Sequence, residues 1–296
     1  MRISRYGESH PGRPEPLTTP AALRTLDRIR HDVRVTDNES VDPNVPHNAR
    51  VWNYLLGGKD NYEADRRLGD QVADMLPAVK LIARGTREFL KHTVEHLAGP
   101  LGIRQFLDIG TGLPTADNTH EVAQRTAPSS RVVYVDNDPL VLAHARALLT
   151  STPEGATQYV HADAGDPEKV LQEAAQTLDF DQPVALMLLS IVHFFDDEDA
   201  ARVVRTLLDA VPSGSYLALA HGTFDLDGER DQDVVDTWNA STTTPLHGRS
   251  KEELAAWVSD LEVLDPGIVS VTNWRPEGLW TQAPAVPQYG LLARKP

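Results

Sequence analysis

Short apolar runs alternate with amphipathic segments from about residue 100 onward. The pattern predicts five strands, each followed by a helix. The expected strands are 105–110, 131–136, 157–163, 183–190 and 215–221, and the expected helices are 115–126, 139–149, 167–176, 197–211 and 250–261. Repeated strand–helix units indicate an α/β fold with a parallel sheet that is covered on both faces. Two last runs, 267–274 and 288–295, have no helix between them, which predicts an antiparallel pair at one edge.

The first third of the chain has a different pattern. Residues 1–42 are rich in Pro, Arg, Asp and Ser, so we expect a mobile tail. Residues 43–98 follow a helical period and predict three helices, the third of them after Pro77 and with a break at Gly85. We therefore expect a helical lid segment over 43–98 in front of a core domain over 99–296.

Composition narrows the class of protein. The chain has 296 residues, of which 41% are apolar, and a formal net charge of −15. An acidic surface repels phosphate backbones, so we expect no nucleic-acid partner. The absence of cysteine excludes disulfides and thiolate ligands, and we expect no metal site. With no long apolar stretch and no signal peptide, a cytoplasmic protein without membrane contact is expected.

Candidate chemistry gathers where the first three strands end. Asp108, Gly110 and Gly112 follow the first strand, and such glycines allow a ligand to approach the backbone at a strand–helix turn. Asp136 ends the second strand, where a carboxylate can accept hydrogen bonds from both hydroxyls of a ribose. Asp163 ends the third strand and is placed to meet an adenine amino group.

Two cofactor classes fit this pattern. A dinucleotide, and hence an oxidoreductase, is one alternative, but Pro114-Thr115 stands where the dinucleotide fingerprint requires small residues. The negative charge of Asp108 also disfavours a pyrophosphate. It suits a ligand that carries an ammonium group, as S-adenosylmethionine (SAM) does.

The motifs FLDIGTG, YVDNDP, HADAGD and LLSIVHFFDDEDA resemble those of class I SAM-dependent methyltransferases. With ARVWNYLLGGKDNYEADR in front, the chain resembles an actinobacterial family of SAM-methyltransferase-like proteins of largely unassigned substrate. The resemblance implies a Rossmann-like sheet of seven strands with an antiparallel last strand. It implies that SAM is held at the methionine end, the ribose and the adenine by Asp108, Gly110, Gly112, Asp136, Asn137, Asp163 and Ser190.

The stretch YLLGGKDNY (54–62) permits two interpretations. Adjacent glycines end a helix readily, so a solvated turn is one. The other is a lid loop over the strand ends, because loops near a site often carry function. Under the lid hypothesis the residues that face cofactor or substrate are Tyr54, Lys59, Asp60, Asn61 and Tyr62, together with His221 after the fifth strand.

His193 follows the fourth strand and is the candidate catalytic residue. A neutral imidazole there could take a proton from an attacking hydroxyl or amine. The alternative is a histidine packed beside Phe194. The expected reaction is methyl transfer from SAM to an oxygen or nitrogen of a small molecule, driven mainly by alignment of the reactants. A SAM- or nucleoside-binding regulatory protein without transfer activity is the alternative function.

Overall fold

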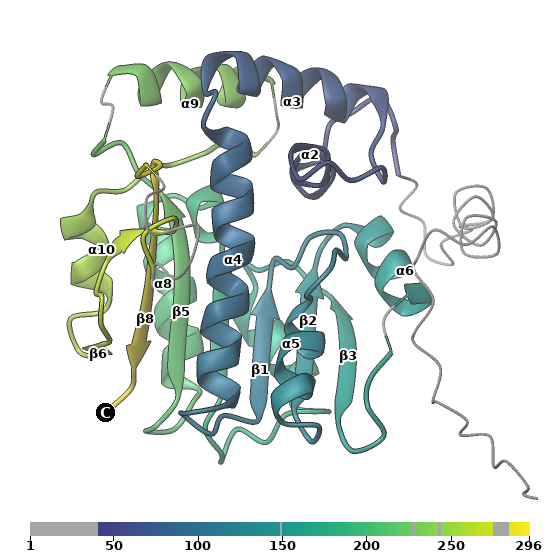
Figure 1. Ribbon diagram of the computed structural model, residues 1–296, viewed down its shortest axis with the longest axis vertical. Helices are drawn as coiled ribbons and strands as arrows, with labels where there is room; N and C mark the ends of the chain where they lie inside the picture. Colours follow the sequence, from purple (N-terminus) through teal and green to yellow (C-terminus); the bar gives the residue numbers. More distant parts are fainter. Residues whose placement is uncertain (1–40, 149, 227–228, 242–243, 275–283) are drawn as a thin grey trace, which may run out of the picture. The chain divides into compact units, whose positions relative to one another are not determined.

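The computed structural model describes residues 41–148, 150–226, 229–241, 244–274 and 284–296 (Figure 1). The predicted tail, apart from its last two residues, lies outside the described residues. No helix within the described ranges is both long and apolar enough to cross a membrane.

A mixed sheet with the strand order β3-β2-β1-β4-β5-β8-β6 forms the centre of the fold. The first five strands run parallel, and β8 runs antiparallel to β5. Two short strands, β6 and β7, both pair with β8 and share one edge position. The predicted seven-position sheet with an antiparallel last strand is thus confirmed. The strands are β1 (Gln105–Ile109), β2 (Arg131–Asp136), β3 (Ala156–His161), β4 (Ala185–Leu189), β5 (Tyr216–Gly222), β6 (Glu262–Val263), β7 (Val269–Ser270) and β8 (Gln288–Arg294).

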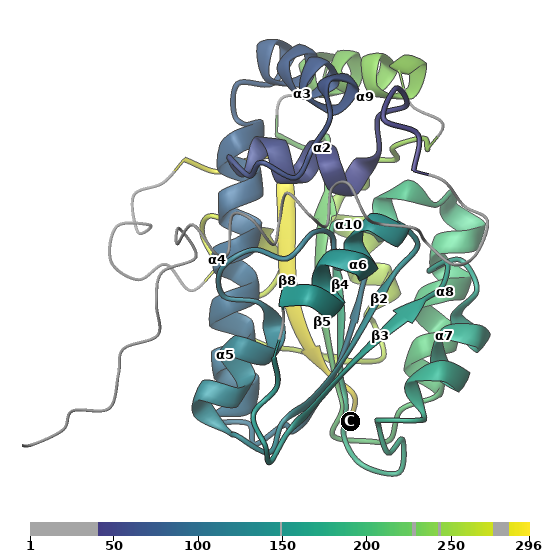
Figure 2. The same ribbon diagram turned by 90° about the vertical axis from the view of Figure 1, so that its right-hand side faces the viewer.

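Helices cover both faces of this sheet (Figure 2). Alternate strand residues point to opposite faces: Leu107 and Ile109 pack with one helix layer, and Phe106 packs with the other. The first layer contains α7 (Pro167–Ala174), α8 (Asp197–Asp209) and α10 (Lys251–Trp257), and the second contains α4 (Val79–Ala98) and α5 (Thr119–Thr126). Helix α6 (Pro139–Leu148) lies against β2 and β3.

The expected break of the third helix at Gly85 is wrong, because α4 is continuous. A Cβ atom at Gly85 would lie 3.1 Å from the Thr272 side chain and 3.2 Å from that of Val271. The glycine therefore allows close packing. The predicted strand 267–274 shrinks to β7 because the chain turns after Ser270: the Val271 N–H still donates to the carbonyl of Gln288 in β8, but the Asn273 N–H donates to the carbonyl of Ser270.

Helix α5 begins at Thr119 and not near residue 115 as predicted. Asn118 and Glu121 form a capping box: each side chain accepts from the other residue's backbone N–H. Asn118 also exchanges hydrogen bonds with the Thr115 backbone. The residues after the glycine loop are therefore held as an irregular loop before the helix begins.

Three helices form a cap at the carboxyl ends of the parallel strands, namely α2 (Asn48–Leu55), α3 (Glu63–Met75) and α9 (Glu229–Ser241) (Figure 1). Helix α9 was not predicted, because its sequence is mostly polar. It lies beside α3 and contributes Trp238 to an apolar cluster with residues of α2, α3 and α4. The other buried members of that cluster are Val51, Leu55, Leu68, Val72, Val79 and Ala83.

A buried polar group, the Arg50 cluster (His47, Arg50, Asp65 and Asp138), joins the cap to the sheet. Arg50 Nε lies 3.6 Å from Asp65 Oδ1 and 3.8 Å from Asp138 Oδ2. His47 Nδ1 lies 3.1 Å from Asp138 Oδ2. Asp65 also accepts hydrogen bonds from the backbone N–H groups of His47 and Tyr62. Because α2 and α3 meet the β2–α6 turn here, this cluster sets the position of the cap.

We expect Asp65→Ala to lower the free energy of unfolding by about 3 kcal/mol. The substitution removes the nearest anion from a buried guanidinium and leaves two backbone donors without their acceptor. Urea denaturation measures the effect. Asp70→Ala is the control, since it removes an exposed carboxylate from the same helix. That carboxylate accepts a hydrogen bond from the Tyr54 hydroxyl, and its loss should lower the free energy of unfolding by less than about 1 kcal/mol. Equal costs would show that the Arg50 cluster does not stabilise the cap.

Candidate functional site

The loop after β1 brings a buried acid to a glycine turn. Asp108 is buried, and its Oδ2 accepts a hydrogen bond of 2.5 Å from the Thr119 hydroxyl. Burial raises the pKa of Asp108 to about 6, although the Thr119 hydrogen bond and the nearby Arg87 both oppose the rise. Gly110 has a φ of +74°, and a Cβ atom there would lie 2.7 Å from Ile191. Any larger residue would therefore displace the loop that follows β4.

The end of β2 presents a second acid in a fixed orientation. Asp136 accepts hydrogen bonds of 2.9 Å from the backbone N–H groups of Gly112 and Asp138, one on each carboxylate oxygen. Burial raises the pKa of Asp136, and these two bonds oppose the rise. Each oxygen keeps a further lone pair, so this carboxylate can accept two more hydrogen bonds from a ligand diol.

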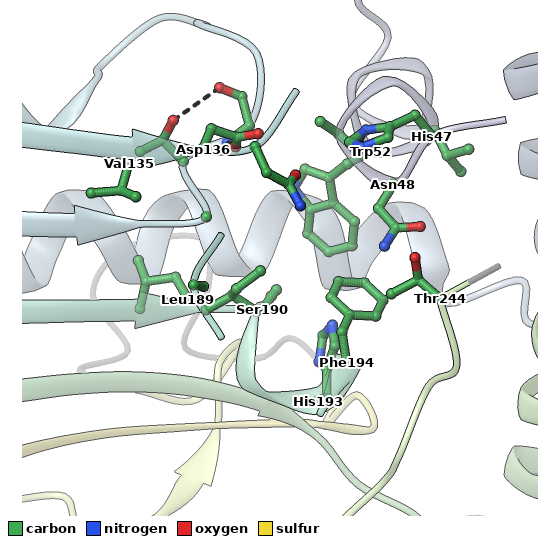
Figure 3. A pocket seen from close by; sticks show the side chains of 18 of the residues that line it. His47, Asn48, Trp52, Val135, Asp136, Leu189, Ser190, His193, Phe194 and Thr244 are labelled. Atoms are coloured by element: carbon green, nitrogen blue, oxygen red, sulfur yellow. Dashed lines mark hydrogen bonds between the residues drawn. The ribbon is translucent and has the colours of Figure 1, made fainter. Parts of the chain in front are cut away.

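A cavity of about 280 Å³ opens beside these acids (Figure 3). All the residues that the sequence predicts for the cofactor line it, and so does His193. The predicted cofactor residues are Asp108, Gly110, Gly112, Asp136, Asn137, Asp163 and Ser190. Ser190 has a positive φ of 61° and accepts a 2.6 Å hydrogen bond from the Gln288 side chain. Asp163 is exposed, and its Oδ1 accepts from the backbone N–H of Gly165.

The cap supplies lining residues that sequence reasoning missed. Figure 3 shows Asn48 and Trp52 of α2 facing the strand ends that carry Asp136 and Ser190. No spacing in the sequence distinguishes these two residues from the other positions of α2. Arg87 of α4 also lines the cavity, and its guanidinium donates to the backbone oxygens of Ala116 and Asp117.

The loop 57–62 has a different place from the one that the lid hypothesis gives it. Asn53, which is buried, organises the loop: its Oδ1 accepts from the Asp60 N–H and from the Asn61 side chain. A Cβ atom at Gly58 would collide with the same side chain. None of the predicted lid residues, Tyr54, Lys59, Asp60, Asn61, Tyr62 and His221, lines this cavity or the two smaller ones found among the described residues. These contacts favour the interpretation of the loop as a turn that follows α2.

His193 and His221 lie together under the cavity, with ring centroids 5.6 Å apart. His221 is fully buried and contacts Arg249, whose Nη1 lies 2.9 Å from its Nε2. Burial lowers the pKa of His221 to about 4. Burial also lowers the pKa of His193 well below its usual value, and the nearby His221, Arg249 and His247 add to this. Both rings are therefore neutral near pH 7, and His221 supports His193 from outside the cavity.

Comparison with known proteins assigns the family. A family model described as S-adenosyl methyltransferase matches residues 34–296. A solved DUF574-family protein from Streptomyces avermitilis is 45% identical, with a TM-score of 0.84 over 87% of this chain and 100% of that one. A candidate methyltransferase from Thermobifida fusca is 38% identical, with a TM-score of 0.77 over 85% and 96%. No curated protein matches. The chain belongs to the S-adenosyl methyltransferase family and is a SAM-dependent enzyme.

The residues present fit SAM. Asp108 lines the cavity while it is otherwise buried, and burial raises its pKa, so an ammonium group in the cavity would stabilise its charged form. The outward lone pairs of Asp136 fit a ribose diol. The Pro114-Thr115 departure is accommodated by the irregular loop before α5, which leaves the glycine turn intact.

We expect SAM affinity to rise about tenfold between pH 5 and pH 7. The amino group of the ligand stays charged over this range, while a carboxyl with a pKa of about 6 goes from about one-tenth to about nine-tenths ionised. Calorimetric titration at several pH values measures the rise. Without ligand the sign is opposite: a raised carboxyl pKa stabilises the fold below about pH 4, and that contribution is lost as the pH rises through 6. Asp108→Asn should flatten both dependences, and an unchanged pH profile in this variant would contradict the assignment.

Asn48→Ala is expected to weaken SAM binding about tenfold with little change in melting temperature, because it removes one polar group from the cavity wall. Lys59→Ala should leave the affinity within about twofold, since Lys59 does not line the cavity. Calorimetry on both variants decides between the two interpretations of the loop. The opposite ranking would restore the loop 57–62 as the ligand-facing lid.

Proposed function

We propose that this S-adenosyl methyltransferase methylates an oxygen or nitrogen atom of a small molecule. The observation that carries the proposal is the form of the cavity, which runs from the acidic strand ends to His193 and Phe194 and is partly covered by the cap. A macromolecular acceptor would need an open approach to the reacting atom, whereas α2 and α9 residues cover this end of the cavity.

The methionine end of SAM is a zwitterion, and Asp108 of β1 and Arg87 of α4 offer a partner for each of its charges. Asp108 would take the ammonium group, and Arg87 would take the carboxylate. The pKa of Arg87 is lowered by burial, and Asp108 partly opposes this, so the two side chains interact. Gly110 and Gly112 let the backbone approach this end without a side chain in between.

The rest of the cofactor would follow the strand ends in their order in the sheet. Asp136 would accept from both ribose hydroxyls, with Asn137 beside it, and Asp163 would accept from the adenine amino group. Ser190, at the end of β4, would contact the cofactor on the side that faces the acceptor.

SAM, when bound, supplies an electrophilic methyl group on a positively charged sulfur. The acceptor's lone pair would form the new bond to that carbon, the electrons of the carbon–sulfur bond would remain on sulfur, and the acceptor's proton would pass to water. The protein's part is to hold the acceptor in line with that methyl and to exclude water. Residues of the cap and of the β4–α8 segment, among them Trp52 and Phe194, form the wall that would do both.

We propose that His193 orients the acceptor and does not act as a strong base. Its lowered pKa makes complete proton transfer to it unfavourable near pH 7. The Gly222 N–H approaches His193 Nδ1 at 3.4 Å, which favours the neutral tautomer with hydrogen on Nε2. That N–H would donate a hydrogen bond to the acceptor and orient it.

The experiment that tests the proposal uses methyl-labelled SAM, purified enzyme and fractionated cell extract. We expect label to appear in a small-molecule fraction. Asp136→Ala is the control. Losing two charge-assisted hydrogen bonds should weaken SAM affinity by roughly 30- to 150-fold, or about 2–3 kcal/mol, so transfer at low SAM concentration should fall accordingly.

The same variant separates hydrogen bonding from general electrostatics. S-adenosylhomocysteine lacks the sulfonium charge, so a hydrogen-bond loss should weaken both ligands equally, while a charge effect should weaken SAM more. Label that appears only in protein or nucleic acid would overturn the small-molecule acceptor.

A further inference from the structure

A second cavity of about 110 Å³ lies beneath the cap, beside the cofactor cavity. Its walls come from α2, α3, α4 and α9, from the segment after β5 and from the start of β8. The lining residues are Leu55, Val72, Leu76, Val79, Ile82, His193, Phe194, Gly222, Thr223, Phe224, Val235, Trp238, Leu246, His247, Gly248, Pro287 and Gln288.

The two cavities are adjacent, because they share lining residues. Leu55, His193, Phe194 and Trp238 line both of them. The rings of Phe194 and Trp238 are stacked, with centroids 6.1 Å apart. A molecule in the second cavity would therefore touch the same side chains as the end of the cofactor cavity that lies farthest from Asp136. Under the proposed function, the methyl acceptor lies at this end of the cofactor cavity.

The second cavity differs from the first in charge. The first contains Asp108, Asp136 and Asp163, and also Arg87. Among the described residues that line the second, none is Asp, Glu, Lys or Arg. Burying a carboxylate, phosphate or ammonium there without a partner would be strongly unfavourable, so the lining selects against charged ligands.

Three polar groups that line this cavity already have partners within the protein. Gln288 Nε2 donates to Ser190 Oγ at 2.6 Å, and Thr223 Oγ1 accepts from the Asp225 N–H. The backbone N–H of His247 donates to the carbonyl of His193. The site can therefore satisfy one polar group of a ligand near His193, and the rest of the ligand must be apolar.

The size of the cavity sets the scale of that apolar part. Apolar cavities of about 150 Å³ accept benzene. A cavity of about 110 Å³ in this structure is of the same order, and it matches one six-membered ring when the flanking side chains adjust slightly.

We propose that the second cavity is the acceptor site and that it takes an uncharged compound, which buries a ring-sized apolar group and places a single hydroxyl or uncharged amine to accept a hydrogen bond from His193 Nε2–H. This inference rests on the proposed function, because it names the class of molecule that the same enzyme methylates. It excludes acids, phosphate esters and amines that are protonated at neutral pH from having their charged groups in this cavity.

The test uses wild-type enzyme saturated with S-adenosylhomocysteine and three ring-sized probes at neutral pH: phenol, benzoate and benzylamine. Ligand-observed NMR titration measures each affinity. We expect phenol to bind at least tenfold more tightly than benzoate or protonated benzylamine. Equal or tighter binding of either ion would overturn the inference, and this comparison needs no variant.

A pair of variants locates the binding. Leu246 is half-buried and lines the second cavity only, so Leu246→Trp should fill it and weaken phenol binding at least tenfold while S-adenosylhomocysteine still binds. Leu226→Trp adds the same side chain at an exposed position and should leave phenol binding unchanged. Phenol binding that survives Leu246→Trp would overturn the assignment of the cavity. Failure of wild-type enzyme to bind S-adenosylhomocysteine would instead contradict the proposed function.

Discussion

The short turn between β2 and α6 connects Asp136 to the cap. Its central residue is Asp138, which contacts both. The N–H of Asp138 donates to one oxygen of Asp136. The Asp138 carboxylate accepts from the N–H of Leu140 at the start of α6. The other oxygen of that carboxylate lies 3.1 Å from His47 and 3.8 Å from Arg50 of the cap. Movement of the cap therefore changes the surroundings of Asp136. The cap also lines the cavity, so its position and the geometry of the cofactor acids depend on the same residues.

Burial of acids in this cavity is unfavourable until a cation arrives. Desolvation raises the pKa of both Asp108 and Asp136. The neighbouring cation, Arg87, is itself partly desolvated and is committed to two backbone oxygens. A ligand with an ammonium and a sulfonium group relieves this imbalance, whereas a pyrophosphate would increase it. The preference for SAM over a dinucleotide thus follows from the charge of the strand ends as well as from the loop sequence.

The sequence predicts what depends on local periodicity and on strand ends. Unbroken apolar runs predict the parallel strands, and because those strands end at one edge, the pattern alone brings Asp108, Asp136 and Asp163 together. Contacts between distant segments could not be predicted. Gly85 is a packing contact with the segment after β7, and α9 is held by Trp238 and not by an amphipathic pattern. The contacts of the loop 57–62 could not be predicted from its local sequence either. Its run of hydrogen-bonding side chains resembles a ligand loop, but the Asn61 side chain and the Asp60 backbone N–H both donate to Asn53 Oδ1 of α2.

The contrast between the two cavities bears on how proton loss accompanies methyl transfer. As a neutral acceptor attacks, positive charge leaves sulfur near the acidic strand ends and develops on the acceptor at an apolar boundary. An apolar surrounding disfavours that developing charge, and His193 cannot take the proton readily because desolvation, His221, Arg249 and His247 all lower its pKa. The acceptor's proton would therefore pass to water as the new bond forms, so that neither a full cation nor a full anion is buried. A phenolic hydroxyl releases its proton more readily during this step than an aliphatic one, since its pKa lies near 10. The apolar lining where the two cavities meet thus favours an acceptor with a relatively acidic hydroxyl, which needs no strong base from the protein.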